Sequence, residues 1–174
     1  VLDPHSDTCM ATLNNVKEIA KINDEYLAKV IPHYEEVIVV APDAGAFKRL
    51  SKTIKRVPLI YATKNRNTVT GELSNVEIHT GGISIAGKRL LIVDDICDGG
   101  GTFILLAKEL NNVNNNPQIH FDSKLELYVT HGIFSKGVDE LLKNYRIIYT
   151  TNSFNTIYNP NVIQYNIENI LREV

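Results

Sequence analysis

Arg89-Leu90-Leu91-Ile92-Val93-Asp94-Asp95-Ile96-Cys97-Asp98-Gly99-Gly100-Gly101-Thr102 is the stretch of sequence that decides the fold. Residues 90–93 are a continuous apolar run, which is typical of a strand buried on both faces of a parallel sheet. Two adjacent carboxylates, Asp94 and Asp95, then Asp98 and three glycines follow, and residues 103–110 have the apolar spacing of a helix. A buried strand that turns through glycines into a helix predicts one βα unit of an α/β fold.

The same order of strand and helix recurs on both sides of this unit. Apolar spacing predicts a helix over residues 16–31 that ends before Pro32. We expect further strands at residues 37–41, 58–62, 125–129 and 146–150, and helices at residues 47–54 and 138–142. The repeated order predicts a parallel, doubly wound sheet with helices on both faces and right-handed crossovers.

The segment before the central strand departs from this order. Residues 63–75 are polar and without a clear period, which predicts a mobile loop. Residues 76–79 and 83–86 flank Gly81-Gly82, as the strands of a hairpin would. The predicted fold class is therefore α/β, with a mobile loop or hairpin inserted before the central strand.

Length and composition limit the class of protein. The chain has 174 residues, 44% of them hydrophobic, which is enough for one globular core. Its 18 basic and 20 acidic residues predict no general nucleic-acid-binding surface. The two cysteines, Cys9 and Cys97, are too few for a disulfide framework, and no apolar run approaches the roughly 18 residues of a membrane span. We expect a cytoplasmic protein.

The loop at residues 94–102 is the candidate binding site. Ligands of open α/β sheets bind at the carboxyl ends of the strands. Consecutive glycines let backbone N–H groups converge on an anion, and the next helix adds partial positive charge, so a phosphate fits at residues 99–102. Asp94 and Asp95 would accept hydrogen bonds from vicinal sugar hydroxyls. The simpler alternative is a tight turn before a capped helix.

Two other kinds of phosphate loop do not match these residues. A Walker A loop needs a lysine directly before its serine or threonine, and Gly101 precedes Thr102 instead. A dinucleotide-binding fingerprint that begins at Gly99 would need glycine or alanine at Ile104.

Residues 91–102 resemble the phosphoribosyl-diphosphate motif of type I phosphoribosyltransferases and of ribose-phosphate pyrophosphokinases. Three further segments, in the family's order, resemble the pyrophosphokinases in particular. Ala-Pro-Asp-Ala-Gly at residues 41–45 is similar to their diphosphate loop, Lys-Asn-Arg at 64–66 to their catalytic loop, and Thr-His-Gly-Ile-Phe-Ser at 130–135 to the segment after their next strand. The resemblance covers nearly all of this chain but only the carboxyl half of the family.

The resemblance implies a sheet of the type I phosphoribosyltransferase kind and a diphosphate transfer. The family moves diphosphate from ATP to the anomeric hydroxyl of ribose 5-phosphate, which gives phosphoribosyl diphosphate and AMP. Lys64 and Arg66 would be the catalytic cations, although without the resemblance a solvated loop is the simpler interpretation. The residues that would bind ribose 5-phosphate are Asp94, Asp95, Asp98, Gly99, Gly100, Gly101 and Thr102, and those of the diphosphate loop are Asp43, Ala44 and Gly45.

Asp3-Pro4-His5 resembles the family's Asp-x-His metal element, which ends its amino-terminal half. The resemblance implies that His5 and Asp43 bind Mg²⁺, unless His5 is only a frayed terminal residue. Residues 1–15 would then be the end of a missing amino-terminal domain, and residues 16–174 the phosphoribosyltransferase-like domain. The implied partners are ATP, ribose 5-phosphate and further copies in a homo-oligomer, with no nucleic acid and no membrane.

The sequence departs from the family in two places. Gly99 and Gly100 stand where the synthetases commonly have threonine and alanine, which removes a hydroxyl donor to the sugar phosphate. One arginine follows Lys64, where the family often has two. Separately, the acids around Cys97 should raise the pKa of its thiol, so we do not expect a nucleophile there, and we expect His131 to be mainly structural.

Two alternatives stay open. A type I phosphoribosyltransferase, which uses phosphoribosyl diphosphate with a nucleobase, would have the same loop at residues 94–102. A noncatalytic, synthetase-associated regulatory subunit would keep the fold, but it has no physical need for Lys64, Arg66 and Asp43.

Overall fold

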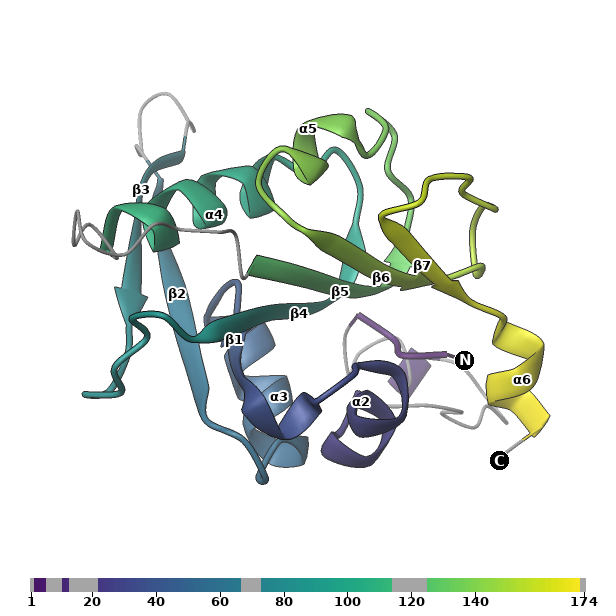
Figure 1. Ribbon diagram of the computed structural model, residues 1–174, viewed down its shortest axis with the longest axis horizontal. Coiled ribbons are helices and arrows are strands. Elements are labelled where there is room, and N and C mark those ends of the chain that lie inside the picture. The colour runs from purple at the N-terminus through teal and green to yellow at the C-terminus, as the bar shows by residue number, and fades with distance from the viewer. Residues whose placement is uncertain (1, 6–10, 13–21, 67–72, 114–124, 173–174) are drawn as a thin grey trace.

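A computed structural model describes residues 2–5, 11–12, 22–66, 73–113 and 125–172 of the protein. Its centre is a seven-stranded sheet with the order β3-β2-β1-β4-β5-β6-β7 (Figure 1). Neighbouring strands are parallel except β2 and β3, which are antiparallel. The strands are β1 (Val37–Ala41), β2 (Leu59–Arg66), β3 (Leu73–His79), β4 (Arg89–Cys97), β5 (Leu125–Gly132), β6 (Ile147–Thr151) and β7 (Val162–Tyr165).

Helices cover both faces of the sheet, as Figure 1 shows. They are α2 (Asp24–Val30), α3 (Ala44–Thr53), α4 (Gly101–Val113), α5 (Asp139–Leu142) and α6 (Ile167–Arg172), with a short 3-10 helix η1 (Tyr34–Glu36) before β1. Apolar side chains of α2 and α3 pack in one core, and those of α4 and α5 pack in the other. All five residues of β1 are buried, which explains its unbroken apolar sequence.

Most of the predicted elements are confirmed. All five predicted strands are present, and β2, β4 and β5 extend beyond their predicted ends. The helix predicted over residues 16–31 is confirmed only in part: α2 begins at Asp24, after Asn23 as an extended N-cap, and ends at Val30 before Pro32 as expected, while residues 16–21 lie outside the described part. The apolar runs in the sequence therefore predicted the parallel strands correctly, but the polar carboxyl ends of these strands were not recognised as strand.

The segment from residue 63 to residue 86 differs from the prediction. Part of the expected loop is strand, because β2 continues to Arg66 and pairs with β3 from Leu73 onward; residues 67–72 lie outside the described part. Of the hairpin predicted at Gly81-Gly82, the first strand is confirmed, because residues 76–79 belong to β3, but the second strand is wrong. The turn exists, since Ile83 N–H donates to the Thr80 carbonyl at 3.0 Å, but residues 83–86 form no strand. The physical reason is topology: after edge strand β3, the chain must cross β2 and β1 to reach β4.

Strand β7 and helix α6 were not predicted. β7 extends the sheet beyond β6 with Ile148 opposite Val162 and Thr151 opposite Tyr165. Its four residues are too short for a convincing alternation of apolar and polar side chains. In the described part of the chain, no helix combines the length and apolar character that a membrane crossing requires.

Candidate functional site

Asp94 and Asp95 lie near the carboxyl end of β4, where Arg49 from α3 bridges them. The Arg49 Nη2 group donates to Asp94 Oδ1 at 2.7 Å and to Asp95 Oδ1 at 3.0 Å. The Asp94 side chain is 14% exposed and that of Asp95 only 2%. Asp94 is therefore the acid that a ligand reaches more easily.

The two acids differ in their electrostatics as well. Burial, with the Asp95 carboxyl alongside, raises the pKa of Asp94 to about 8. Burial also opposes ionisation of Asp95, but the contact with Asp94, the Arg49 charge and the His5 contact together hold the pKa of Asp95 below its usual range. The pair thus holds one firmly ionised carboxylate beside one that resists ionisation.

The glycine-rich turn connects β4 to α4. Gly100 has φ +74°, a conformation that side chains other than glycine rarely adopt, and a Cβ there would lie 3.2 Å from two atoms of Leu141. The Gly100 carbonyl accepts the Ile104 N–H at 3.0 Å, which starts the helix. The N–H groups at the start of this 13-residue helix therefore stand next to the paired acids, the arrangement expected of a phosphate site.

Cys97, the last residue of β4, is a buried thiol with no disulfide partner among the described residues. Burial first, and then Asp94 and Asp98, raise the pKa of this thiol to about 12. A raised thiol pKa agrees with the prediction that Cys97 is not a nucleophile. Burial contributes more to this shift than the neighbouring acids, which were the cause inferred from the sequence.

The amino-terminal residues 2–5 pack against the same strand ends. His5 Nδ1 lies 2.6 Å from Asp95 Oδ2, and Thr130 Oγ1 donates to Asp3 Oδ2 at 2.6 Å. His131 Nε2 lies 3.0 Å from the Leu2 carbonyl, and its Nδ1 lies 2.8 Å from Ser153 Oγ. His131 therefore connects three segments at this edge, which agrees with the structural role expected of it.

The predicted diphosphate loop, residues 43–45, lies at the start of α3. Asp43 is the N-cap of this helix, and its Oδ1 accepts the Ala46 N–H at 2.9 Å. A Cβ at Gly45 would lie 3.3 Å from the same carboxylate oxygen, so a small residue is favoured there. The loop and Arg49 belong to one helix, which brings both to the β4 end.

The fit of the predicted Mg²⁺ ligands is partial. Asp43 offers carboxylate oxygen, which Mg²⁺ prefers, whereas His5 is engaged with Asp95 and its side chain is 74% exposed. Within the described ranges, neither residue belongs to a group of three or more converging metal-ligand side chains. Any Mg²⁺ at this edge would need ligands from a bound phosphate or from water.

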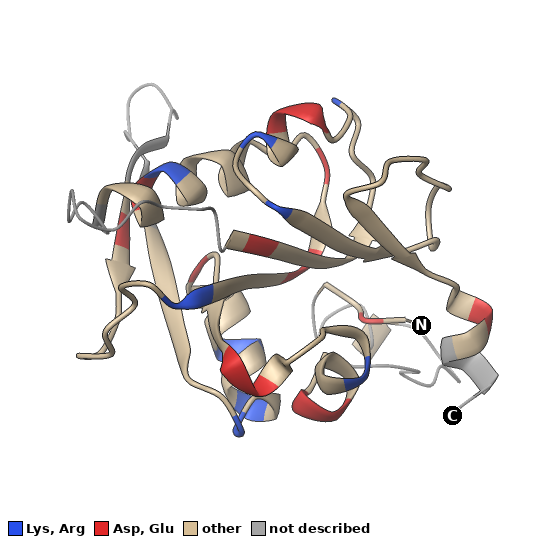
Figure 2. Ribbon diagram, viewed as in Figure 1, with Lys and Arg blue, Asp and Glu red and all other residues tan. Residues whose placement is uncertain are grey.

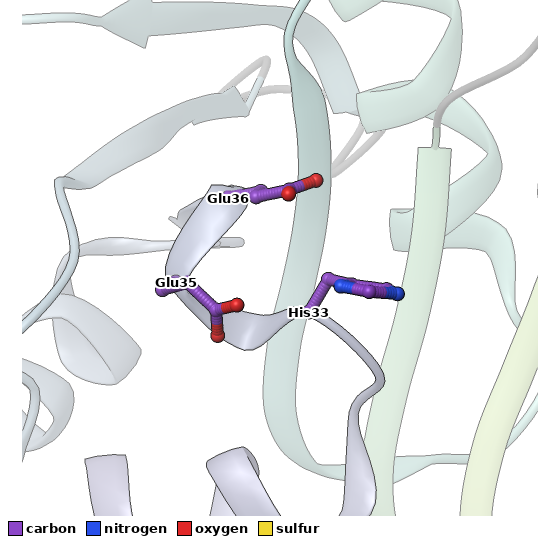
Figure 3. A group of neighbouring side chains, drawn as sticks. All are labelled: His33, Glu35 and Glu36. Atoms are coloured by element: carbon purple, nitrogen blue, oxygen red, sulfur yellow. The ribbon is translucent and has the colours of Figure 1, made fainter.

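The one such group in the described part is His33, Glu35 and Glu36, shown in Figure 3. All three side chains are exposed and precede β1, so they lie at the amino ends of the strands, away from Asp94 and Asp95. Glu35 and Glu36 also line a hollow of about 630 Å³, together with Lys88, Arg89 and Arg146. Neither feature belongs to the candidate site.

The predicted catalytic residues Lys64 and Arg66 are placed only by their backbone. Lys64 pairs with Val76 and Arg66 with Leu73 near the end of β2, so both follow the carboxyl end of that strand's parallel part. Their side chains lie outside the described part of the protein. The structure therefore leaves their role a prediction.

Sequence reasoning missed Arg49. No local signal marks it, because which residue of α3 reaches the β4 end depends on how that helix packs on the sheet. Asp3 was also missed as a buried contact of Thr130, although its neighbour His5 was singled out. Acidic and basic residues are otherwise interspersed over the described ribbon (Figure 2).

Comparisons with known proteins agree with this fold and site. The phosphoribosyl transferase domain model matches residues 10–154. Ribose-phosphate pyrophosphokinase 4 of Arabidopsis thaliana is 38% identical over 107 residues, which cover 62% of this chain and 28% of that protein. The ribose-phosphate pyrophosphokinase of Pyrococcus abyssi is 28% identical over 151 residues, or 83% of this chain and 49% of that protein.

A solved structure agrees as well. Phosphoribosylpyrophosphate synthetase from Mycobacterium smegmatis matches 99% of this chain and 55% of its own, with a TM-score of 0.73 and 21% identity. A parallel sheet with a glycine loop after paired acids defines a protein of the type I phosphoribosyltransferase fold. The chain belongs to the phosphoribosyl transferase domain family. It spans about half or less of the length of the relatives described above.

Proposed function

We propose that this chain is the sugar-phosphate-binding part of a ribose-phosphate diphosphokinase. The observation that carries the proposal is the acid pair Asp94 and Asp95, held by Arg49 directly before a glycine turn and a helix N-terminus. Such an edge can accept the hydroxyls of a sugar and the phosphate on the same sugar. Relatives named ribose-phosphate pyrophosphokinase support this reading over a phosphoribosyltransferase that uses a nucleobase.

Ribose 5-phosphate would bind with its phosphate at residues 99–102 and its hydroxyls toward Asp94. Asp98, exposed at the mouth of the loop, would remain near the sugar. Asp43, Ala44 and Gly45 would face the diphosphate at the start of α3. The anomeric hydroxyl oxygen would then attack the β-phosphorus of ATP and release its proton to water, the bond from that phosphorus to the α-phosphate oxygen would break, and AMP would leave.

Phosphoryl transfer depends mainly on positioning and on neutralising charge. In the proposed mechanism Lys64 and Arg66 close over the transferring group from the end of β2. Mg²⁺, held by Asp43 and the nucleotide phosphates with His5 nearby, would neutralise phosphate oxygens. Replacing Lys64 or Arg66 by an uncharged residue should lower turnover about 10²- to 10³-fold.

Other features of the proposal follow from the family alone. We propose a cytoplasmic homo-oligomer in which ATP and ribose 5-phosphate are the small-molecule partners. Residues 1–15 would connect to an amino-terminal domain, with the contacts of residues 2–5 at the β4 and β5 ends as the junction.

The proposal is tested by titrating the chain with ribose 5-phosphate in a calorimeter. Asp94→Asn should weaken binding about 10- to 100-fold, because the amide NH₂ group cannot accept a hydrogen bond from a sugar hydroxyl and leaves that hydroxyl unpaired. Glu77→Gln removes one negative charge from an exposed position on β3 and should bind like the parent. No binding to the parent, or consumption of phosphoribosyl diphosphate with a nucleobase, would reject the proposal.

A further inference from the structure

We infer that Lys136 binds the phosphate group of the sugar phosphate, at the place where Gly99 leaves the loop without a side chain. The inference rests on the proposed function, because it takes residues 99–102 as the phosphate site. It adds a residue from the turn after β5 to that site.

The turn that carries Lys136 is fixed against the end of β4. The N–H groups of Ile133 and Phe134 both donate to the Cys97 carbonyl, at 2.9 Å and 3.1 Å. The Gly137 N–H donates to the Phe134 carbonyl at 2.8 Å and closes the turn. Lys136 is therefore positioned relative to the strand that leads into the glycine loop.

The Lys136 side chain lies along the loop itself. A Cβ on Gly99 would be 3.5 Å from Lys136 Cε and 3.6 Å from Cδ, which are ordinary contact distances. The neighbouring Gly100 is similarly covered by Leu141. The segment from Lys136 to Leu141 thus forms one wall of the loop, with a single ammonium group on it.

The charges around the loop favour a phosphate contact for the Lys136 ammonium group. Asp94, Asp95 and Asp98 precede the glycines, and Arg49 is already engaged with the first two of them. Lys136 is exposed and has no ion pair or side-chain hydrogen bond with any residue in the described ranges. The α4 N-terminus supplies only about half a positive charge. Because Asp95 is held in its ionised form next to Asp94 and already shares Arg49, a phosphate dianion at the glycines is stabilised by a further cation, and a lysine on a flexible stem suits it.

The test compares two lysine variants that make the same change in net charge. Lys136→Met should weaken ribose 5-phosphate binding about tenfold, the usual effect of losing one charge-assisted hydrogen bond. Lys108→Met, from an exposed position on α4, should bind like the parent. Because Lys136 is exposed, its effect should shrink between about 0.05 M and about 0.5 M salt.

A rescue variant tests the place of the contact. Adding Gly99→Thr to Lys136→Met puts a hydroxyl donor on the loop, and the contact distances leave room for its Cβ. We expect this double variant to recover several-fold in affinity. The inference is overturned if Lys136→Met and Lys108→Met bind alike, if the loss does not depend on salt, or if the double variant recovers nothing. These results do not affect the proposed function as long as the parent protein binds ribose 5-phosphate. If the parent does not bind it, the proposed function itself is rejected.

Discussion

At the scale of single residues, the fold holds two carboxyl groups side by side with one arginine between them. Asp94 and Asp95 are adjacent, largely buried and partly neutralised by one arginine. The sequence predicted both acids, because two carboxylates at the end of an apolar strand are unusual without a ligand. It did not predict Arg49, because which helical residue reaches a strand end depends on how α3 packs on the sheet.

Replacing Arg49 should leave these two buried carboxyl groups without their shared cation. Arg49→Met keeps the aliphatic stem but removes the cation, so we expect the free energy of unfolding to fall by about 3 kcal/mol. Ribose 5-phosphate binding should fall with it. Lys48→Met, the neighbouring exposed residue, is the matched control and should change neither. Urea denaturation and calorimetry measure the two effects, and equal results for the two variants would contradict the role given to Arg49.

Asp94 should make the protein less stable as pH rises. Its folded-state pKa of about 8 lies above the ordinary aspartate value of 3.8, so its contribution to stability is full below about pH 4 and is lost as pH rises through about 8. Asp94→Asn resembles the protonated acid and does not titrate. The variant should therefore gain at least about 1 kcal/mol over the parent between pH 5 and pH 8 in urea denaturation. A gain that is the same at both pH values would show that the buried acid ionises without cost.

At the scale of elements, periodicity and burial predicted the parallel strands and the helices between them. They failed where long-range pairing decides the structure. The backbone of residues 63–66 is strand because β3 returns to pair with it, and no local pattern indicates that partner. The turn at Gly81-Gly82 was recognised correctly, but its flanking residues belong to a crossover rather than a hairpin. The glycine turn between β4 and α4 was predictable because a strand, three glycines and a helix are contiguous in the sequence, and its phosphate-binding role stays a prediction.

The β4–α4 turn should not tolerate a side chain at Gly100. Gly100→Val would place a branched side chain at φ +74° and within 3.2 Å of Leu141, on the side that faces the core. We expect a loss of about 1–3 kcal/mol in stability from backbone strain, and loss of ribose 5-phosphate binding because the loop must shift. Gly81→Val has a similar φ of +60° with open space around it, so it carries the strain without the clash. Retained binding in Gly100→Val would remove the loop from the site.

At the scale of the whole molecule, the two ends of the sheet hold different charge clusters. At the amino ends, Glu126 is fully buried and accepts from Arg89 at 2.6 Å and 3.0 Å, and Arg146 also donates to it. This carboxylate has matched cations and holds strands together. At the carboxyl ends, Arg49 bridges Asp94 and Asp95, and Asp98, the glycines and the start of α4 follow directly. Ligand binding is therefore expected at one end of the sheet and structural stabilisation at the other.

The last prediction concerns what the 174 residues do by themselves. The proposed sugar-phosphate site lies within the described part, while the synthetase structure that the chain resembles is covered over only 55% of its length. Transfer also requires that the β-phosphorus of ATP is aligned with the anomeric oxygen, which depends on holding the adenine end of the nucleotide. We expect the purified chain to bind ribose 5-phosphate and to release AMP from ATP far more slowly than about 1 per second, an ordinary enzymatic rate. The measurement is AMP release with ATP, magnesium and ribose 5-phosphate, with Asp94→Asn as the control for background hydrolysis. Turnover at about 1 per second or faster, abolished in Asp94→Asn, would show that these residues contain a complete active site.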